Sequence, residues 1–159
     1  MQYHQFDKNL SPLQRLTLFH DGSMTKFLEL YFAENVQTEV IKESSQFDDE
    51  YLYDWKQFIP DAQIQREVIL KNQSKGNLIY ARSLWTKLNY DKIMQGNKNN
   101  AIGKNLEKKQ ISQRRQILIA CQTKLPTSSN LPIRDVLSRA YLIYQEDDLL
   151  MYIEEYMLF

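Results

Sequence analysis

The sequence predicts an α+β fold, in which a single antiparallel β-sheet is flanked by helices. Apolar residues recur at helical spacing in residues 12–32 and 89–109, whereas several other segments alternate apolar and polar residues. Short turns separate some of these alternating segments, which favours antiparallel pairing. A chain of 159 residues suits one compact domain, which we place at residues 1–159.

Two helices are expected near the start of the chain. Ser11 and Pro12 form an N-cap followed by proline at the first helical position. The dipeptide at 21–22, Asp-Gly, interrupts the helical pattern, and Ser23 can cap the next helix. That helix has an apolar stripe made of Phe27, Leu28, Tyr31 and Phe32.

The middle of the chain is expected to form strands. Residues 36–44 alternate as a strand does, whereas residues 46–60 are acidic and aromatic, so we expect an irregular insertion with one helical turn. Residues 64–71 and 77–86 then form a hairpin around a turn at 72–76.

Helices and further strands complete the chain. We expect helical structure over 89–109, interrupted near 96–100. The expected strands that follow are 116–121, 136–144 and 149–158, with a loop at 124–132 and an acidic turn at 145–148.

Composition excludes several classes of function. Hydrophobic residues make up 43% of the chain, enough for a core, and 20 basic residues balance 20 acidic ones, so we expect no nucleic-acid partner. No apolar run reaches the roughly 20 residues that a membrane span needs. The single Cys121 rules out an internal disulfide and favours a reducing compartment. His4, His20 and Cys121 lack metal-ligand spacing, so we expect no metal.

Two charged residues lie in apolar strand patterns. Arg66 shares a predicted strand face with Ile64, Val68 and Leu70, where a guanidinium is costly unless it is paired or binds an anion. A guanidinium whose stem packs and whose head reaches water is the simpler alternative from periodicity alone.

Glu155 shares a face with Met151, Ile153 and Met157, so it and Glu154 point to opposite sides of their strand. A carboxylate there is a candidate acid, base or hydroxyl partner. Pairing of Glu155 with Arg66 or another arginine is an equally good interpretation. Arginines 82, 114 and 139 also lie in strand-like segments, where they could converge on a dianion or form salt bridges.

Six segments, in this order, resemble the chorismate pyruvate-lyase family, in particular its cyanobacterial and plastid-encoded branch. They are residues 21–25 (DGSMT), 66–70 (REVIL), 81–83 (ARS), 102–106 (IGKNL), 138–141 (SRAY) and 153–156 (IEEY). The resemblance covers roughly residues 10–158. The chain departs from the family pattern at Ile102, which replaces a leucine, after Arg114, where Arg115 and Gln116 stand, and at its C-terminal end.

The resemblance implies an enclosed ligand pocket beneath helical flaps and cleavage of chorismate to 4-hydroxybenzoate and pyruvate without metal or cofactor. By resemblance, Arg66 holds the ring carboxylate and Glu155 contacts the hydroxyl end, and these two are the expected catalytic residues. Met24 and Ile102 would line the pocket. Arg82 and Arg114 are the further expected substrate-binding residues.

We therefore expect a monomeric lyase for quinone biosynthesis, located in the plastid stroma or the cyanobacterial cytoplasm, that acts on a small aromatic or cyclohexadienyl carboxylate. A non-catalytic binding domain for a small aromatic carboxylate is the main alternative, since related domains serve as ligand sensors. An interaction protein that uses the aromatic segment 47–58 is a third possibility.

Overall fold

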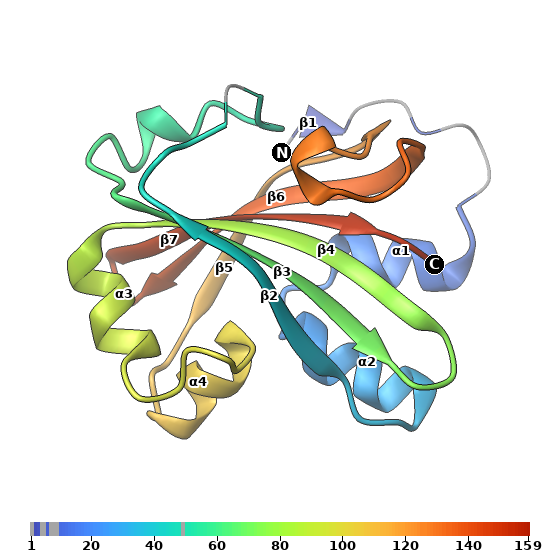
Figure 1. Cartoon of the computed structure of the whole chain (residues 1–159), viewed down its shortest axis with the longest axis horizontal. Helices are drawn as coiled ribbons and strands as arrows, with labels where there is room; N and C mark the ends of the chain where they lie inside the picture. Colours follow the sequence, from blue (N-terminus) through green and yellow to red (C-terminus); the bar gives the residue numbers. More distant parts are fainter. Residues whose placement is uncertain (1, 4–5, 7–9, 49) are drawn as a thin grey trace.

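A seven-stranded sheet forms the centre of the computed structural model, which describes residues 2–3, 6, 10–48 and 50–159. The strand order is β1-β5-β6-β7-β4-β3-β2 (Figure 1). The strands are β1 (Gln2–Tyr3), β2 (Gln37–Ser44), β3 (Ile64–Asn72), β4 (Gly76–Trp85), β5 (Arg114–Lys124), β6 (Asp135–Gln145) and β7 (Asp148–Met157).

The six strands from β5 to β2 pair antiparallel, which confirms the predicted sheet. Strand β1 was not predicted and pairs parallel with β5 at the edge. Two residues are too few to show a period-two pattern. Strand β5 is longer at both ends than the predicted 116–121 because polar residues at its ends face solvent and obscure the alternation.

Within the described residues, four α-helices and two 3-10 turns connect the strands. They are α1 (Pro12–Phe19), α2 (Met24–Phe32), α3 (Lys87–Met94), α4 (Ile102–Lys108), η1 (Trp55–Gln57) and η2 (Thr127–Ser129). Ser11 and Ser23 cap α1 and α2 through their side chains, as predicted. The helical region after β4 is split into α3 and α4, which confirms the expected interruption.

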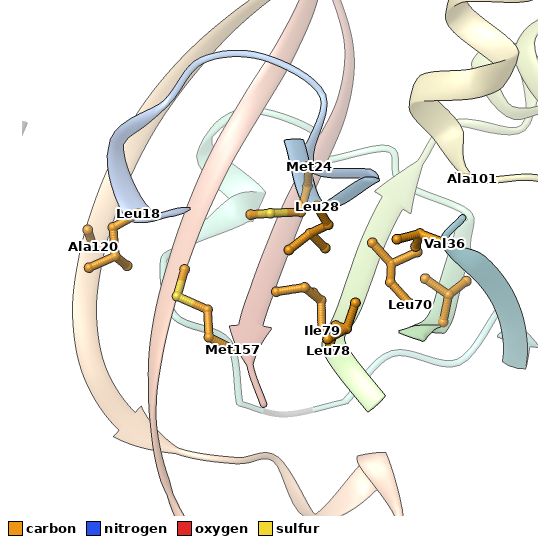
Figure 2. Close-up of a cluster of buried hydrophobic side chains, with 11 residues drawn as sticks. Leu18, Met24, Leu28, Val36, Leu70, Leu78, Ile79, Ala101, Ala120 and Met157 are labelled. Atoms are coloured by element: carbon orange, nitrogen blue, oxygen red, sulfur yellow. The ribbon is translucent and has the colours of Figure 1, made fainter. Parts of the chain in front are cut away.

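The sheet has two differently covered faces. We call the face that packs against the helices the inner face and the opposite one the outer face. On the inner face, α1 and α2 lie over one end and α3 and α4 over the other (Figure 1). Figure 2 shows Met24 and Leu28 of α2 facing Leu70, Leu78 and Ile79.

The aromatic segment 47–58 covers part of the outer face. Trp55 is buried, and Phe47, Tyr51 and Phe58 are partly buried against Leu84, Leu142 and Tyr152 of the sheet. The third possibility from the sequence required an exposed apolar patch on this segment. Its aromatic side chains instead contribute to the core on the outer face.

Strand register decides which charged residues share a face. Arg66 lies opposite Ser83 in the β3–β4 hairpin, and Arg82 lies opposite Glu67 on one side and Glu154 on the other. Because side chains alternate along a strand, Arg66 and Arg82 point to opposite faces although they share a hairpin. The sheet thus separates two groups of buried charges.

Candidate functional site

A cavity of about 50 Å³ lies between the inner face and the N-terminal ends of α2 and α4. Its lining residues are Ser23, Met24, Thr25, Arg66, Val68, Leu70, Ala81, Ala101, Ile102, Gly103, Arg115, Tyr141, Ile143, Ile153 and Glu155. The apolar side chains of strands β3, β6 and β7 form its floor. The structure thus brings Met24, Arg66, Ile102 and Glu155 together.

Arg66 reaches the cavity from β3 with its guanidinium almost completely buried, at 1% exposure. Its Nη2 donates to the carbonyl oxygens of Lys98 and Asn100, both at 2.9 Å. Its Nε has no hydrogen-bond partner among the described residues, and the nearest carboxylate oxygen, of Glu43, is 3.8 Å away. Burial lowers the pKa of Arg66 from its usual value. A guanidinium has five N–H donors, so this one retains capacity for an anion.

Glu155 reaches the cavity from β7 with both carboxylate oxygens engaged. Arg139 Nε donates to Oε2 at 2.7 Å, and the hydroxyl of Tyr141 donates to Oε1 at 2.8 Å. Arg139 is itself fixed by the carbonyl oxygen of His20 at 2.7 Å. Each carboxylate oxygen has a further lone pair, so Glu155 can still accept a hydrogen bond from a ligand.

Tyr141 acts as a hydrogen-bond donor in this arrangement. Burial raises its pKa above the usual range, and the neighbouring Glu155 adds to the shift. The hydroxyl therefore keeps its proton at neutral pH. Arg139, Tyr141 and Glu155 lie on adjacent strands β6 and β7, where the cross-strand register places Arg139 opposite Glu155.

The roof of the cavity is a close contact between the starts of α2 and α4. A Cβ atom on Gly103 would lie 2.5 Å from Ser23 Oγ, so only glycine permits this approach without movement. Ala101, at the N-cap of α4, makes no side-chain capping bond. The first-turn N–H groups of a helix have no partner within the helix, and in α2 one of them, Lys26 N, donates to Ser23 Oγ at 3.4 Å.

Arg82 lies outside this cavity, which corrects the expectation that it binds substrate there. It points to the outer face, where its Nη2 donates to Glu154 at 2.6 Å and its Nη1 donates to Asp48 at 3.0 Å. Burial alone would lower the pKa of Arg82, but the charge and hydrogen bonding of Glu154, together with the neighbouring Tyr156 and Tyr80, outweigh it and raise the pKa.

Arg114 also lies outside the cavity, because it begins β5 with its side chain over the Tyr144 ring, 4.4 Å from the ring centre. Its neighbour Arg115 lines the cavity instead. Sequence reasoning missed Arg115 as a site residue, although strand alternation from Ile117, which packs on the inner face, indicates its direction.

Among the residues that the structure describes, no group of three or more His, Cys, Asp or Glu side chains is placed to hold a metal ion. None of the helices within the described ranges is long and apolar enough to cross a membrane.

Comparisons with known proteins agree with this architecture. The family model described as chorismate pyruvate-lyase Rv2949c-like matches residues 18–159. No curated protein shows a significant match. Similar solved structures include the crystal structure of PhnF from Mycobacterium smegmatis, with a TM-score of 0.61 and 13% sequence identity. The similarity covers 86% of this chain and 64% of that one, and it shows the fold.

Proposed function

Because this chain belongs to the chorismate pyruvate-lyase Rv2949c-like family, we propose that it cleaves chorismate into 4-hydroxybenzoate and pyruvate in the cavity beneath α2 and α4. The observation that carries the proposal is the joint presence of Arg66 and Glu155 in one largely apolar cavity. A buried guanidinium with unused donors suits a carboxylate, and a carboxylate on the far side suits a hydroxyl group.

The spacing of these two residues supports a ring held between them. The register places Glu155 two strands and two residues away from Arg66. With strands about 4.8 Å apart and about 3.3 Å per residue, their Cα atoms lie on the order of 12 Å apart. Two side chains and a six-membered ring with opposed substituents can bridge that distance.

The reaction needs positioning more than covalent help. The bond between ring C3 and the ether oxygen breaks, the hydrogen on C4 leaves as a proton, and the ring becomes aromatic. The released enolpyruvate takes up a proton to become pyruvate. Arg66 would hold the ring carboxylate, and Glu155, oriented by Arg139 and Tyr141, would bind the C4 hydroxyl. Fixed geometry and preplaced charge can contribute several kcal/mol to such a step.

The cavity is small compared with most ligand pockets. It encloses about 50 Å³, whereas ligand pockets are typically about 300–1,000 Å³. Binding therefore requires the starts of α2 and α4 to separate at the Ser23–Gly103 contact. Side-chain rearrangement at Met24 and Ile102 would contribute.

A non-catalytic binding domain for an aromatic carboxylate is the second candidate. The observation that favours it is the pairing of both carboxylate oxygens of Glu155, with Arg139 and with Tyr141, which gives the carboxylate a structural role. Such a domain needs only the donors of Arg66 and a closed cavity.

Incubation of the protein with chorismate separates the two candidates. The lyase releases 4-hydroxybenzoate and pyruvate in equal amounts, and Arg66→Ala abolishes their release. Binding of 4-hydroxybenzoate in calorimetry without any product from chorismate would replace the lyase with the binding domain.

The proposed product, 4-hydroxybenzoate, leads to a proposal for the biological role of the protein. We propose that 4-hydroxybenzoate supplies a quinone pathway, in a plastid or a cyanobacterium. The abundance of Lys, Asn, Gln, Ile and Tyr, which is typical of organelle coding bias, supports this setting.

A further inference from the structure

Arg115 lies at the junction of the cavity with a groove on the surface. The groove, of about 590 Å³, includes Asp21, Lys26 and Glu107 in its walls. Ser23, Gly103 and Arg115 line both the groove and the cavity. Arg115 is therefore placed where a ligand in the cavity would extend toward the groove.

The guanidinium of Arg115 has donors to spare. Its Nη1 donates to the carbonyl oxygen of Asp21 at 3.2 Å, which is a neutral acceptor. Its Nε is buried and has no hydrogen-bond partner among the described residues. The guanidinium carbon lies 5.9 Å from the centre of the Tyr141 ring. Since Tyr141 donates to Glu155, Arg115 lies at the Glu155 end of the cavity.

The other charged side chains discussed for the cavity and the groove are paired with each other or lie at the far end of the cavity. Glu155 and Arg139 neutralise each other. Lys26 and Glu107 form an exposed pair in the groove with 3.7 Å between Nζ and Oε1. Arg66 lies two strands away from Glu155, at the other end of the cavity. A ligand with one carboxylate at Arg66 and a second at the Glu155 end would meet Arg115.

We propose that Arg115 binds the second carboxylate of a dicarboxylate substrate, the one attached to the ring through an ether oxygen. This inference rests on the proposed function and deepens it. The site would then hold the dianionic substrate at two arginines and the monoanionic ring product at one. Release of the ether-linked group of the substrate would also free Arg115 and let the ring product leave.

A stable pair of ligands isolates this contact. 3-(Carboxymethoxy)-4-hydroxybenzoate carries both carboxylates and cannot be cleaved to pyruvate, whereas 4-hydroxybenzoate carries one. We expect the wild-type protein to bind the dicarboxylate at least tenfold more tightly in calorimetry. Arg115→Gln should remove this preference while the dissociation constant of 4-hydroxybenzoate changes less than twofold.

Arg15→Gln is the matched control, because that exposed side chain on α1 lines neither the cavity nor the groove and loses the same charge. It should retain the preference. Equal loss in both variants would mean that only net charge matters, and an unchanged preference in Arg115→Gln would overturn the assignment. Failure of the wild type to bind either compound would reject the whole site. Normal binding preferences without chorismate turnover would reject only the lyase.

Discussion

At the scale of single residues, Glu154 and Glu155 show how one step along a strand changes the role of a carboxylate. Both are buried and paired with an arginine. Glu154 lies on the outer face and accepts hydrogen bonds from Arg82, Tyr152 and Tyr156. Glu155 lies on the inner face and lines the cavity. We interpret Glu154 as structural and Glu155 as functional.

Glutamine substitutions test this division. Glu155→Gln should lower chorismate turnover about 100-fold, the scale of losing a positioned charged group. Glu154→Gln should leave turnover of the folded protein nearly intact but lower the free energy of unfolding by about 3 kcal/mol, because it breaks a buried pair. Steady-state kinetics and urea unfolding of both variants measure the two effects. The reverse pattern would assign the chemistry to the outer face.

Arg66→Ala tests the anion site. Removing a charge-assisted hydrogen bond to a carboxylate should weaken 4-hydroxybenzoate binding by about 1.5–3 kcal/mol. Arg82→Ala is a control for loss of a buried arginine on the same hairpin, and should change stability more than affinity. Calorimetry on folded protein gives both affinities. An unchanged affinity in Arg66→Ala would remove this residue from the site.

Sequence reasoning found residues on central strands more readily than residues at strand ends. Arg66 and Glu155 stand in clear alternating patterns, so their direction could be predicted. Arg82 was grouped with Arg66 because both lie in apolar segments, but the cross-strand register that separates their faces cannot be read from periodicity alone. Arg115 follows a polar stretch at 112–114, so only Ile117, two residues further on, marks its face.

At the scale of elements, α2 and α4 meet beside the cavity at Ser23 and Gly103. Ser23 both caps α2 through Lys26 N and meets Gly103. Gly103→Ala should lower the free energy of unfolding by about 1–3 kcal/mol, because the added Cβ would overlap Ser23 Oγ. The measurement is the free energy of unfolding with and without 4-hydroxybenzoate.

The double variant Ser23→Gly with Gly103→Ala is the matched control. Glycine at the N-cap costs only a few tenths of a kcal/mol, and alanine is favourable within a helix. The double variant should therefore recover most of the stability that Gly103→Ala loses. Additive losses would show that the two residues do not meet.

The junction of α1 and α2 predicts a dependence of stability on pH. His20 stacks on Phe27 with ring centres 4.8 Å apart, and its Nε2 is buried without a hydrogen-bond partner among the described residues. Burial lowers the pKa of His20 below 6.5, and the charge of Arg139 adds to the shift. Below pH 6.5 the unfolded chain therefore takes up a proton that the folded protein resists, so stability falls as the pH is lowered.

His20→Gln should flatten this dependence. Thermal unfolding between pH 5.5 and 8 should show a smaller loss of stability on acidification in the variant than in the wild type. His4 is present in both proteins, so the difference reports His20 alone. Parallel pH profiles would mean that His20 titrates normally in the folded protein.

The sequence predicted most elements because their signals are local. Serine caps, a proline at the first helical turn and period-two patterns marked α1, α2 and the six long strands. The packing of segment 47–58 on the outer face could not be predicted, because its contacts are with strands far away in the sequence. Hydrogen bonds from Leu52 N to Glu154 and from Arg82 to the carbonyl oxygen of Glu50 fasten it there.

At the scale of the whole molecule, the two faces of the sheet differ in how their buried charges are used. The outer face holds a network of buried charges and tyrosines, in which Arg82 and Tyr156 both donate to Glu154. The inner face holds arginines with unused donors around a small cavity. Unsatisfied buried donors are costly, so their concentration on one face indicates a site shaped for an anion.

The central claim is that this cavity binds an aromatic carboxylate between Arg66 and Glu155. A crystal structure of the protein with 4-hydroxybenzoate tests it most directly. We expect the carboxylate within about 3 Å of the Arg66 guanidinium, the hydroxyl group at a similar distance from Glu155, and a wider gap between Ser23 and Gly103. A ligand bound on the outer face beside Arg82, or an inner cavity that stays closed at saturating ligand, would contradict it.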